Sequence, residues 1–192
     1  MKKVLFIMAF CFAFLFSCAA DQGSANPANA DPARAEISFT FNRQSGSSSN
    51  QYAVWVEDSS GNFVKTLYAT KYTANGGWER RPQSIPLWVS RSGLSTMAKK
   101  DIDAFSGATP RTGAQSYRWD GTDKNGNPLP SGEYRIFLEA TLRGDNRVLY
   151  SASITLGNSQ GIPTETFVAA GYFGSSTSER GMIEDVRVVY RQ

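Results

Sequence analysis

A strand–turn–strand pattern over residues 117–140 most limits the folds that this chain can adopt. Residues 133–140 alternate between apolar and polar side chains, except at Phe137, and a period of two is typical of a half-buried β-strand. Residues 120–132, which precede this strand, are rich in Asp, Asn, Gly and Pro, the residues that turns use. The segment therefore predicts an antiparallel β-hairpin with a long polar loop.

Most of the remaining chain also has strand patterns. Residues 52–57 are apolar on both faces, which predicts a strand in the centre of its sheet. Only residues 94–105 have helical spacing, and two prolines argue against long regular structure in residues 78–93. We predict an all-β fold, an immunoglobulin-like antiparallel β-sandwich with one short helical insertion. The further expected strands are residues 36–41, 52–57, 63–70, 146–156, 166–170 and 184–190.

The N-terminus predicts export. Lys2 and Lys3 precede an apolar run that ends in small residues, which is typical of a secretory signal and too short for a stable membrane span. The sequence LFSC ending at Cys18 resembles the lipobox of bacterial lipoproteins, in which the cysteine is lipidated, whereas cleavage just after it is the alternative. We expect a lipid-anchored periplasmic protein. Its expected parts are a signal peptide (1–18), a disordered tether (19–35) and the β-sandwich domain (36–192).

The composition excludes several kinds of site. The chain has no histidine, and its two cysteines, Cys11 and Cys18, lie in the predicted signal. The mature domain therefore lacks the residues for a Ser-His-Asp or Cys-His catalytic site, a disulfide or a thiolate metal site. Loss of Lys2 and Lys3 with the signal lowers the net charge from +3 to +1, and no basic block is present. We therefore expect neither an enzyme nor a nucleic-acid-binding protein.

One motif has a specific chemical interpretation. The sequence DAFSGAT at residues 103–109 resembles the acceptor motif of bacterial flavin transferases, D-x-x-[ST]-G-A-[ST], whose last residue carries FMN through its phosphate. The resemblance implies that the Thr109 hydroxyl attacks the pyrophosphate of FAD, activated by a metal and a base of the transferase. Gly107 and Ala108 would keep the backbone bare, and Asp103 would be a recognition group. The candidate cofactor-binding residues are Asp103, Ser106, Gly107, Ala108 and Thr109.

The same residues also predict a turn without chemistry. Gly107 in the left-handed conformation would cap the preceding helix, and Pro110 would prevent the helix from continuing. Each interpretation accounts for the whole segment. The exposure of Thr109 is the observation that helps most to separate them.

Two long segments together resemble a known family. VWVEDSSGNFVKTL at residues 54–67, followed by SGATPRTGAQSYRWDGTDKNGNPLPSGEYRIFLEA at residues 106–140, is similar to predicted periplasmic bacterial proteins grouped as domain of unknown function 2271. The resemblance covers roughly residues 36–160. The hairpin WDGTDKNGNPLPSGEY alone also resembles the immunoglobulin-like module of flagellar hook-capping proteins, where it is a scaffold. Both resemblances imply the fold and the compartment, but no activity.

Three weaker patterns have simpler explanations. Residues 120–127 are spaced roughly as in a calcium loop, but they depart from the EF-hand pattern, and turns use the same residues. The acidic pairs at residues 57–58 and 101–103 would suit a hydrolase only if they clustered in a perturbed site. The tryptophans are expected mainly in the core, with Trp78 and Trp88 the two most suited to face a ligand or a flavin.

We therefore expect a non-enzymatic extracytoplasmic β-sandwich protein that carries covalent FMN at Thr109 and acts in electron transfer. Its partners would be a flavin transferase, a membrane redox protein and, through lipid on Cys18, the membrane. The alternative is a structural or partner-binding immunoglobulin-like lipoprotein module without a cofactor. A flavin absorbance spectrum separates the two.

Overall fold

The computed structural model describes residues 34–44, 50–141, 146–157, 163–174 and 180–191. The expected signal peptide, Cys18 and most of the expected tether lie outside the described residues. The chain divides into two compact units, Met1–Asp31 and Pro32–Gln192, and everything described below belongs to the second. None of the helices in these described ranges combines the length and the apolar character needed to cross a membrane.

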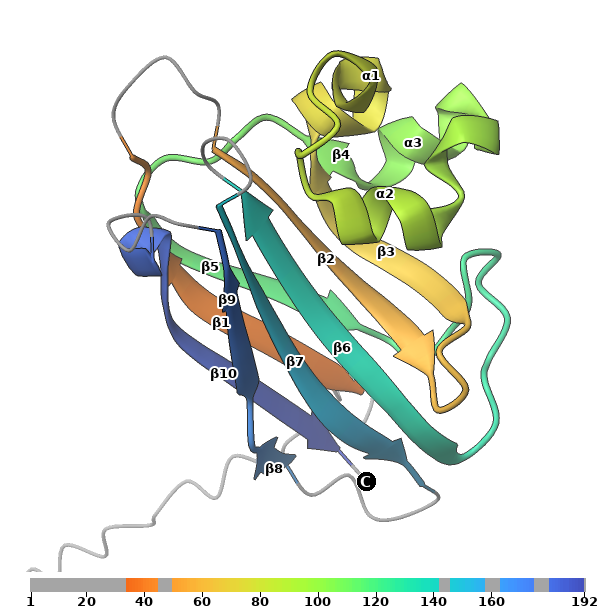
Figure 1. Ribbon diagram of the computed structural model, residues 1–192. Helices are drawn as coiled ribbons and strands as arrows, with labels where there is room; N and C mark the ends of the chain where they lie inside the picture. The colour runs from red at the N-terminus through yellow and green to blue at the C-terminus, as the bar shows by residue number, and fades with distance from the viewer. Residues whose placement is uncertain (1–33, 45–49, 142–145, 158–162, 175–179, 192) are drawn as a thin grey trace, which may run out of the picture. The chain divides into compact units, whose positions relative to one another are not determined.

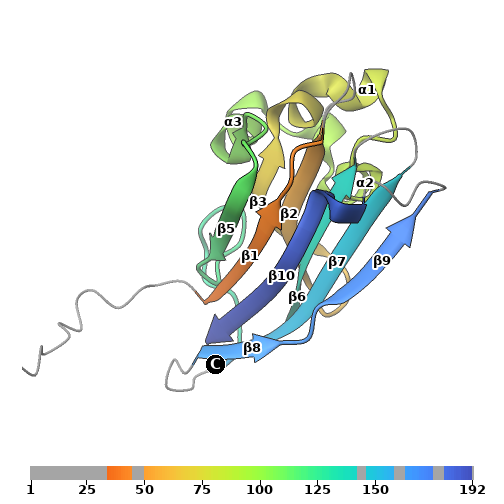
Figure 2. The same cartoon turned by 90° about the vertical axis from the view of Figure 1, so that its left-hand side faces the viewer.

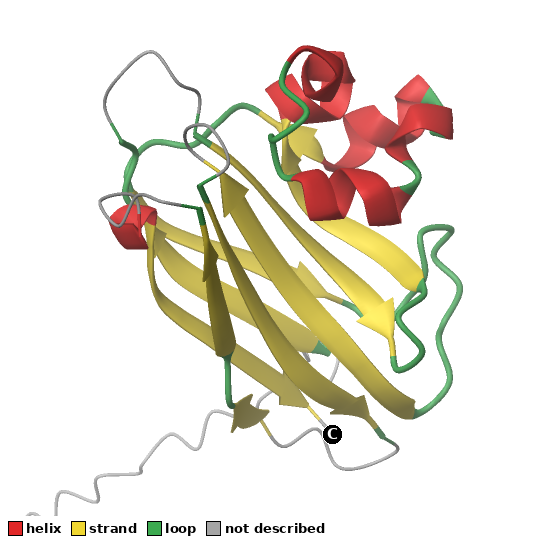
Figure 3. Cartoon of the chain, viewed as in Figure 1, coloured by secondary structure: helices red, strands yellow, loops and turns green. Residues whose placement is uncertain are grey.

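Ten strands in the described residues form two sheets, which confirms the predicted all-β sandwich (Figures 1 and 3). In chain order they are β1 (Ala35–Phe41), β2 (Gln51–Asp58), β3 (Phe63–Thr70), β4 (Ser106–Gly107), β5 (Gly113–Trp119), β6 (Gly132–Thr141), β7 (Arg147–Leu156), β8 (Pro163–Thr166), β9 (Ala169–Phe173) and β10 (Ile183–Arg191). One sheet has the order β5-β1-β10-β8 and the other β4-β3-β2-β6-β7-β9. Neighbouring strands are antiparallel except β3 and β4, which are parallel.

The core between the sheets follows the alternation that the sequence predicts. In β1 every second residue is buried, because the side chains of a strand point alternately to its two faces. Buried residues of β1, such as Phe39, form one cluster with buried residues of the six-stranded sheet, such as Tyr52 and Ile136. The rings of Phe39 and Tyr52 meet edge to face, with 5.5 Å between their centres. These contacts join the two sheets.

β2 is covered on both faces, as predicted for a central strand. Its residues from Gln51 to Glu57 are all buried. On the face away from the four-stranded sheet, Trp55 stacks on Phe137 of β6, with ring centres 5.0 Å apart and 10° between the ring planes. A second apolar cluster forms there with residues of the helical insertion, including Trp88. Figure 1 shows the helices lying against β2 and β3, and Figure 2 shows the same arrangement from the side.

The insertion between β3 and β4 holds more helix than the sequence predicts. The expected helix over residues 94–105 is wrong as one element, because Met97 and Ala98 are extended and interrupt it. A further helix occupies part of the stretch where the prolines argued against regular structure. Pro86 lies in its first turn, where backbone N–H groups have no acceptor within the helix. A residue without an N–H therefore costs no hydrogen bond there. The pieces are η2 (Thr73–Gly77), α1 (Trp78–Arg80), α2 (Pro86–Ser92), η3 (Leu94–Thr96) and α3 (Lys99–Phe105).

The expected strand over residues 166–170 is also wrong, because the chain changes sheets there. β8 ends at Thr166 in the four-stranded sheet, and β9 begins at Ala169 at the edge of the six-stranded sheet. Phe167 lies in this crossover and is 85% exposed. The other strands expected over residues 36–190 agree with the structure to within one residue at each end, except that β5 begins before residue 117.

A buried carboxylate attaches the first turn of α2 to the six-stranded sheet. Glu139 of β6 accepts hydrogen bonds from the backbone N–H groups of Leu87, at 3.2 Å, and Trp88, at 2.9 Å. Arg147 of β7 donates a third hydrogen bond to Glu139, at 3.0 Å. Burial raises the pKa of Glu139, and these three donors limit the rise.

The other end of α2 is attached by a second carboxylate. Glu57 of β2 is buried, and it accepts a hydrogen bond of 2.6 Å from the indole N–H of Trp55. Arg91, in the last turn of α2, forms an ion pair with Glu57. The sheet therefore holds both ends of this short helix through polar contacts as well as through the apolar cluster.

Candidate functional site

The predicted acceptor segment, residues 103–109, lies where the helical insertion returns to the sandwich. After α3, the two residues of β4 pair in parallel with the end of β3, so that Ser106 lies opposite Ala69 and Gly107 opposite Thr70. The chain then leaves the sheet, and residues 108–112 form an irregular loop that leads to β5 in the other sheet (Figure 1). The predicted acceptor therefore lies in a loop beside the end of β3.

Thr109 is half-buried at the start of this loop. Its Oγ1 donates a hydrogen bond of 3.4 Å to the carbonyl oxygen of Asn50, the residue before β2. Asn50 is itself fixed, because its side chain exchanges hydrogen bonds of 2.8 Å and 3.1 Å with the backbone of Gln44. A hydroxyl hydrogen bond of 3.4 Å is long, so the Thr109 hydroxyl is loosely held on a well-ordered residue. Its intermediate exposure is compatible with both interpretations of the motif.

Buried polar residues lie below Thr109 at the end of the sheet. Gln51 Oε1 accepts hydrogen bonds from the hydroxyls of Thr70, at 2.6 Å, and Thr73, at 2.9 Å. Gln51, Thr70 and Thr73 are fully buried, and Asn50 beside them is 3% exposed. These four residues form a polar base that links the acceptor loop to the start of the helical insertion.

Gly107 corrects one expectation from the sequence. The turn interpretation placed it in the left-handed conformation, but Gly107 is absent from the positive-φ glycines of the described residues and forms part of β4. A Cβ atom at this position would lie 2.7 Å from Cε2 of Tyr68. The Tyr68 hydroxyl donates a hydrogen bond of 2.7 Å to the carbonyl oxygen of Ala108. A glycine is therefore needed for the close approach of a ring, not for a helix cap.

The Ser106 hydroxyl is a buried group whose hydrogen bonding is incomplete. In the described part of the chain, its Oγ is enclosed and has no hydrogen-bond partner. Such a group costs free energy, and in native proteins it usually has a functional or structural reason. The Ser106 hydroxyl therefore keeps an unused hydrogen-bond donor three residues before Thr109.

The structure does not bring Asp103 to the Thr109 hydroxyl. Asp103 is exposed on α3, where its carboxylate accepts hydrogen bonds of 3.0 Å and 2.9 Å from Lys99, one helical turn earlier. Ala108 is exposed. Asp103 and Ala108 are thus available to a docking enzyme, whereas Ser106 and Gly107 are packed inward.

A cluster of three tyrosines supports the segment from inside the sandwich, and sequence reasoning missed it. Tyr68 stacks on Tyr117, with ring centres 4.8 Å apart, and Tyr52 lies 5.2 Å from Tyr68. The hydroxyls of Tyr52 and Tyr117 are 2.5 Å apart. Burial raises the pKa of Tyr117 to about 12 and also raises those of Tyr52 and Tyr68. Strand alternation predicts Tyr52 and Tyr117 as inward residues, but not that three strands bring the rings together.

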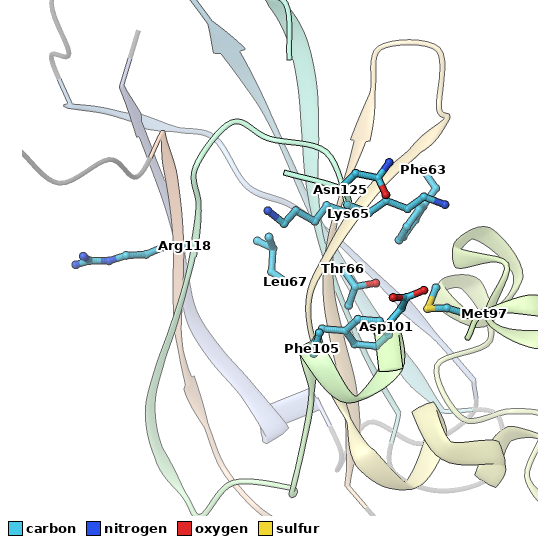
Figure 4. Close-up of a pocket in the computed structure, with 11 residues that line it drawn as sticks. Phe63, Lys65, Thr66, Leu67, Met97, Asp101, Phe105, Arg118 and Asn125 are labelled. Carbon is cyan, nitrogen blue, oxygen red and sulfur yellow. The ribbon is translucent and has the colours of Figure 1, made fainter. Parts of the chain in front are cut away.

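A groove of about 410 Å³ runs along the free part of the β3 edge. It exists because β4 covers only the last two residues of β3, Ala69 and Thr70. Figure 4 shows Phe63 and Lys65 of β3 on one side of the groove and Phe105 of α3 on the other. The groove combines apolar walls with cationic side chains.

A second hollow, of about 340 Å³, lies where the chain leaves β3 for the insertion. Tyr72 is 42% exposed there. A Cβ atom on Gly77 would lie 2.6 Å from Cε1 of Tyr72, so one side of the ring packs directly on the backbone of η2. Lys71 and Arg80, both exposed, provide positive charge at the same hollow.

The weaker sequence candidates do not assemble into sites. The Asp123 carboxylate accepts hydrogen bonds from the side-chain amide of Asn127, at 3.0 Å, and from the backbone N–H groups of Asn127 and Asn125, at 2.9 Å and 2.8 Å. It therefore stabilises the turn, and these bonds lower the pKa of Asp123. Among the residues that the structure describes, no group of three or more His, Cys, Asp or Glu is arranged for a metal ion. The expectation that Trp88 faces a ligand is wrong, because Trp88 is fully buried, and Trp78 packs against the same apolar cluster.

Comparison with known proteins identifies a family. No curated protein and no solved structure matches the chain. A family model described as DUF2271, predicted periplasmic protein, matches residues 34–174. The match runs from β1 to the end of β9 and includes the whole acceptor segment. Because it covers well over half of the chain, the protein belongs to the DUF2271 family of predicted periplasmic proteins.

Proposed function

We propose that the protein is not an enzyme but a carrier of covalent FMN, attached to Thr109, that acts in electron transfer outside the cytoplasm. The observation that carries the proposal is the position of the motif. Its threonine lies half-buried in an irregular loop above a buried polar base, directly after a backbone that Tyr68 holds at Gly107 and Ala108. FMN would supply redox chemistry that the chain's own residues do not provide.

Attachment is a phosphoryl transfer from FAD, and it requires a flavin transferase as partner. Thr109 Oγ1 forms a bond to the phosphorus of the FMN half, the pyrophosphate bond of FAD breaks, and AMP leaves. The hydroxyl proton passes to a base of the transferase, so the hydrogen bond from Thr109 to Asn50 is lost. A typical hydrogen bond contributes about 0.5–1.5 kcal/mol, and because this bond is long, its loss costs no more than that.

The same proposal assigns two further partners. A carrier outside the cytoplasm exchanges electrons with a redox protein of the membrane, because electron transfer requires a donor and an acceptor nearby. Lipid on Cys18 would keep the carrier at that membrane. Cys18 lies outside the described residues, so support for the anchor comes from its position after the apolar N-terminal run.

Intact mass spectrometry after co-expression with a flavin transferase tests the attachment. We expect wild type to gain the mass of one FMN and to become yellow, Thr109→Ala to gain nothing, and Thr109→Ser to be modified because the motif accepts serine. Thr112→Ala is the matched control, since Thr112 lies exposed in the same loop, and it should be modified like wild type. An unmodified wild-type protein, in cells where a known acceptor is modified, rules out the proposal.

A second candidate function is that of a partner-binding module without a cofactor. Exposed aromatic residues on and beside the edge strand β9 favour it, because isolated edges of this kind serve as contact surfaces. They are Phe167, Tyr172 and Phe173. A colourless protein, unmodified in the experiment above, would leave this function as the better supported one.

A further inference from the structure

We infer that the hollow around Tyr72 is the seat of the flavin ring, with Lys71 and Arg80 beside it. The inference rests on the proposed attachment at Thr109 and adds the surface that holds the ring system. The ligand is a planar aromatic group on an anionic phosphodiester arm. The hollow offers the matching chemistry, an aromatic face and two cations.

Thr109 and the hollow lie at the same end of the sheet. β3 and β4 run in parallel, so the two residues after Gly107 and the two residues after Thr70 leave the sheet in the same direction. The backbone dimensions keep the Cα atoms of Thr109 and Lys71 within about 16 Å of each other. The flexible ribityl-phosphate arm of FMN bridges a separation of this kind.

The polar base adds a direct link between the two places. The Thr109 hydroxyl is bound to the carbonyl oxygen of Asn50, and the next residue, Gln51, holds the Thr73 hydroxyl at 2.9 Å. Thr73 is the neighbour of Tyr72 in the chain. Before attachment, acceptor and hollow are therefore bound to two consecutive residues at the start of β2, which places them at the same end of the sheet.

Tyr72 is held as a surface for stacking. One side of its ring packs on the backbone at Gly77, and the residue is still 42% exposed. Asn75 Nδ2 donates a hydrogen bond of 3.1 Å to the carbonyl oxygen of Lys71 and so stabilises the turn between β3 and η2. An aromatic ring that is fixed on one side and open on the other favours stacking of a second planar group.

The charges around the hollow suit a ring that gains negative charge on reduction. Lys71 and Arg80 are exposed at its border, and the lining also contains one acid, Glu79. The surplus positive charge stabilises the reduced state over the oxidised state through Coulomb attraction. The seat therefore raises the midpoint potential of the attached flavin.

The groove along the β3 edge is the other hollow near the segment, and its geometry is less suitable. It is lined by β3 residues from Phe63 to Leu67, before the part of β3 that pairs with β4. Since β4 is parallel to β3, the chain from Gly107 to Thr109 runs away from this groove. An arm on Thr109 would have to fold back over β4 to enter it.

The test uses protein that carries FMN, with attachment confirmed by intact mass before any other measurement. Tyrosine in contact with a flavin quenches its fluorescence. We expect Tyr72→Leu to raise the flavin fluorescence several-fold and Tyr72→Phe to leave the visible circular dichroism of the flavin near that of wild type. Phe63→Leu, the matched control in the β3-edge groove, should change neither signal.

The charge prediction is measured separately, by redox titration. Lys71→Gln combined with Arg80→Gln should lower the midpoint potential, by about 30 mV if the preference for the reduced state falls tenfold. If no FMN is attached, the proposed function itself fails. If FMN is attached but only Phe63→Leu alters its signals, the ring lies in the β3-edge groove. If neither Tyr72→Leu nor Phe63→Leu alters the flavin signals, the ring is free in solvent. A ring in the β3-edge groove or a ring free in solvent overturns the inference.

Discussion

Tyr68 is the residue that gives the acceptor segment its shape. Its ring packs on Gly107 and on Tyr117, and its hydroxyl binds the carbonyl oxygen of Ala108. One side chain thus fixes the backbone on the N-terminal side of Thr109, while the Thr109 hydroxyl keeps only a long hydrogen bond. The backbone of the segment is therefore fixed, whereas the Thr109 hydroxyl is loosely held.

Gly107→Ala should destabilise the fold. The added methyl group would lie 2.7 Å from Cε2 of Tyr68, so the ring must shift inside a packed tyrosine cluster. We expect a loss of about 1–3 kcal/mol in the free energy of unfolding, measured by urea denaturation. In a Tyr68→Ala background the same substitution should cost about 0.5 kcal/mol or less. Equal costs in the two backgrounds would show that the ring is not the cause.

The tyrosine cluster predicts a loss of stability at alkaline pH. Burial raises the pKa of Tyr117 to about 12 in the folded state, above its ordinary value of 10.0, and raises that of Tyr68 as well. These tyrosines therefore make their full contribution to the free energy of unfolding below pH about 10. The contribution is lost as the pH rises through their folded-state pKa values. At pH about 11, folded protein should show less tyrosinate absorbance than the urea-unfolded chain. Equal absorbance would contradict the prediction.

At the scale of elements, the helical insertion depends on the sheet beneath it. α2 is too short to be stable alone, and Glu139 and Glu57 hold its two ends. Trp88 adds apolar contact and donates a hydrogen bond of 3.0 Å to the hydroxyl of Thr66 on β3. The insertion is therefore a layer of the fold rather than an appended lid.

Glu139 should make the stability depend on pH in a defined direction. Burial raises its pKa above 4.5 in the folded state, so the folded protein holds this proton more tightly than the unfolded chain does. The contribution of Glu139 to the free energy of unfolding is largest below pH about 4.5 and is lost as the pH rises through its folded-state pKa. The free energy of unfolding of wild type minus that of Glu139→Gln should fall over this range and then level off. A difference that rises with pH there would refute it.

Most of the strands could be predicted from the sequence, whereas the helices within the predicted insertion could not, for a physical reason. Strand alternation is a local signal, and it located β1, β2, β3 and β10 to within one residue. The short helices of the insertion, of at most seven residues each, have little stability of their own. Pro86 begins a helix here because Glu139, far away in the chain, binds the N–H groups of the next two residues.

The candidate site also has a part that can be predicted from the sequence and a part that cannot. The motif that proposes Thr109 as the acceptor can be found from the sequence, because a chemical motif is contiguous in the chain. Tyr72 and the polar base could not be found from the sequence, since the pairing of β4 with β3 brings them to the acceptor. The motif also contains Ser106 and Gly107, but the packing of Gly107 against Tyr68 and the enclosure of the Ser106 hydroxyl appear only in three dimensions.

At the scale of the whole molecule, the burial of the strands from solvent increases from the edges of the sheets towards β2 and β6. β2 and β6 have neighbours on both sides, and the residues of β2 from Gln51 to Glu57 and of β6 from Ile136 to Thr141 are buried on both faces. β8 and β9 lie at the edges, and half or more of the residues of each are exposed.

Amide hydrogen exchange should follow this gradient. We expect the slowest amides in β2 and β6, at rates set by global unfolding, and much faster exchange in β8 and β9 through local opening. Mass spectrometry of peptic fragments measures the order. β9 amides that exchange as slowly as those of β2 would indicate that an additional chain covers this edge in solution.

The position of β1 has a consequence for the order of synthesis. Among the described strands β1 is made first, and it lies between β5 and β10, which is made last. The nascent chain can pair β1 with β5 midway through translation, but the other edge of β1 stays open until the final strand has been made. An open edge is a template for pairing with a foreign strand. Synthesis of residues 183–191 therefore determines when this edge of β1 can no longer pair with another molecule, and a chain interrupted before residue 183 would keep the edge open.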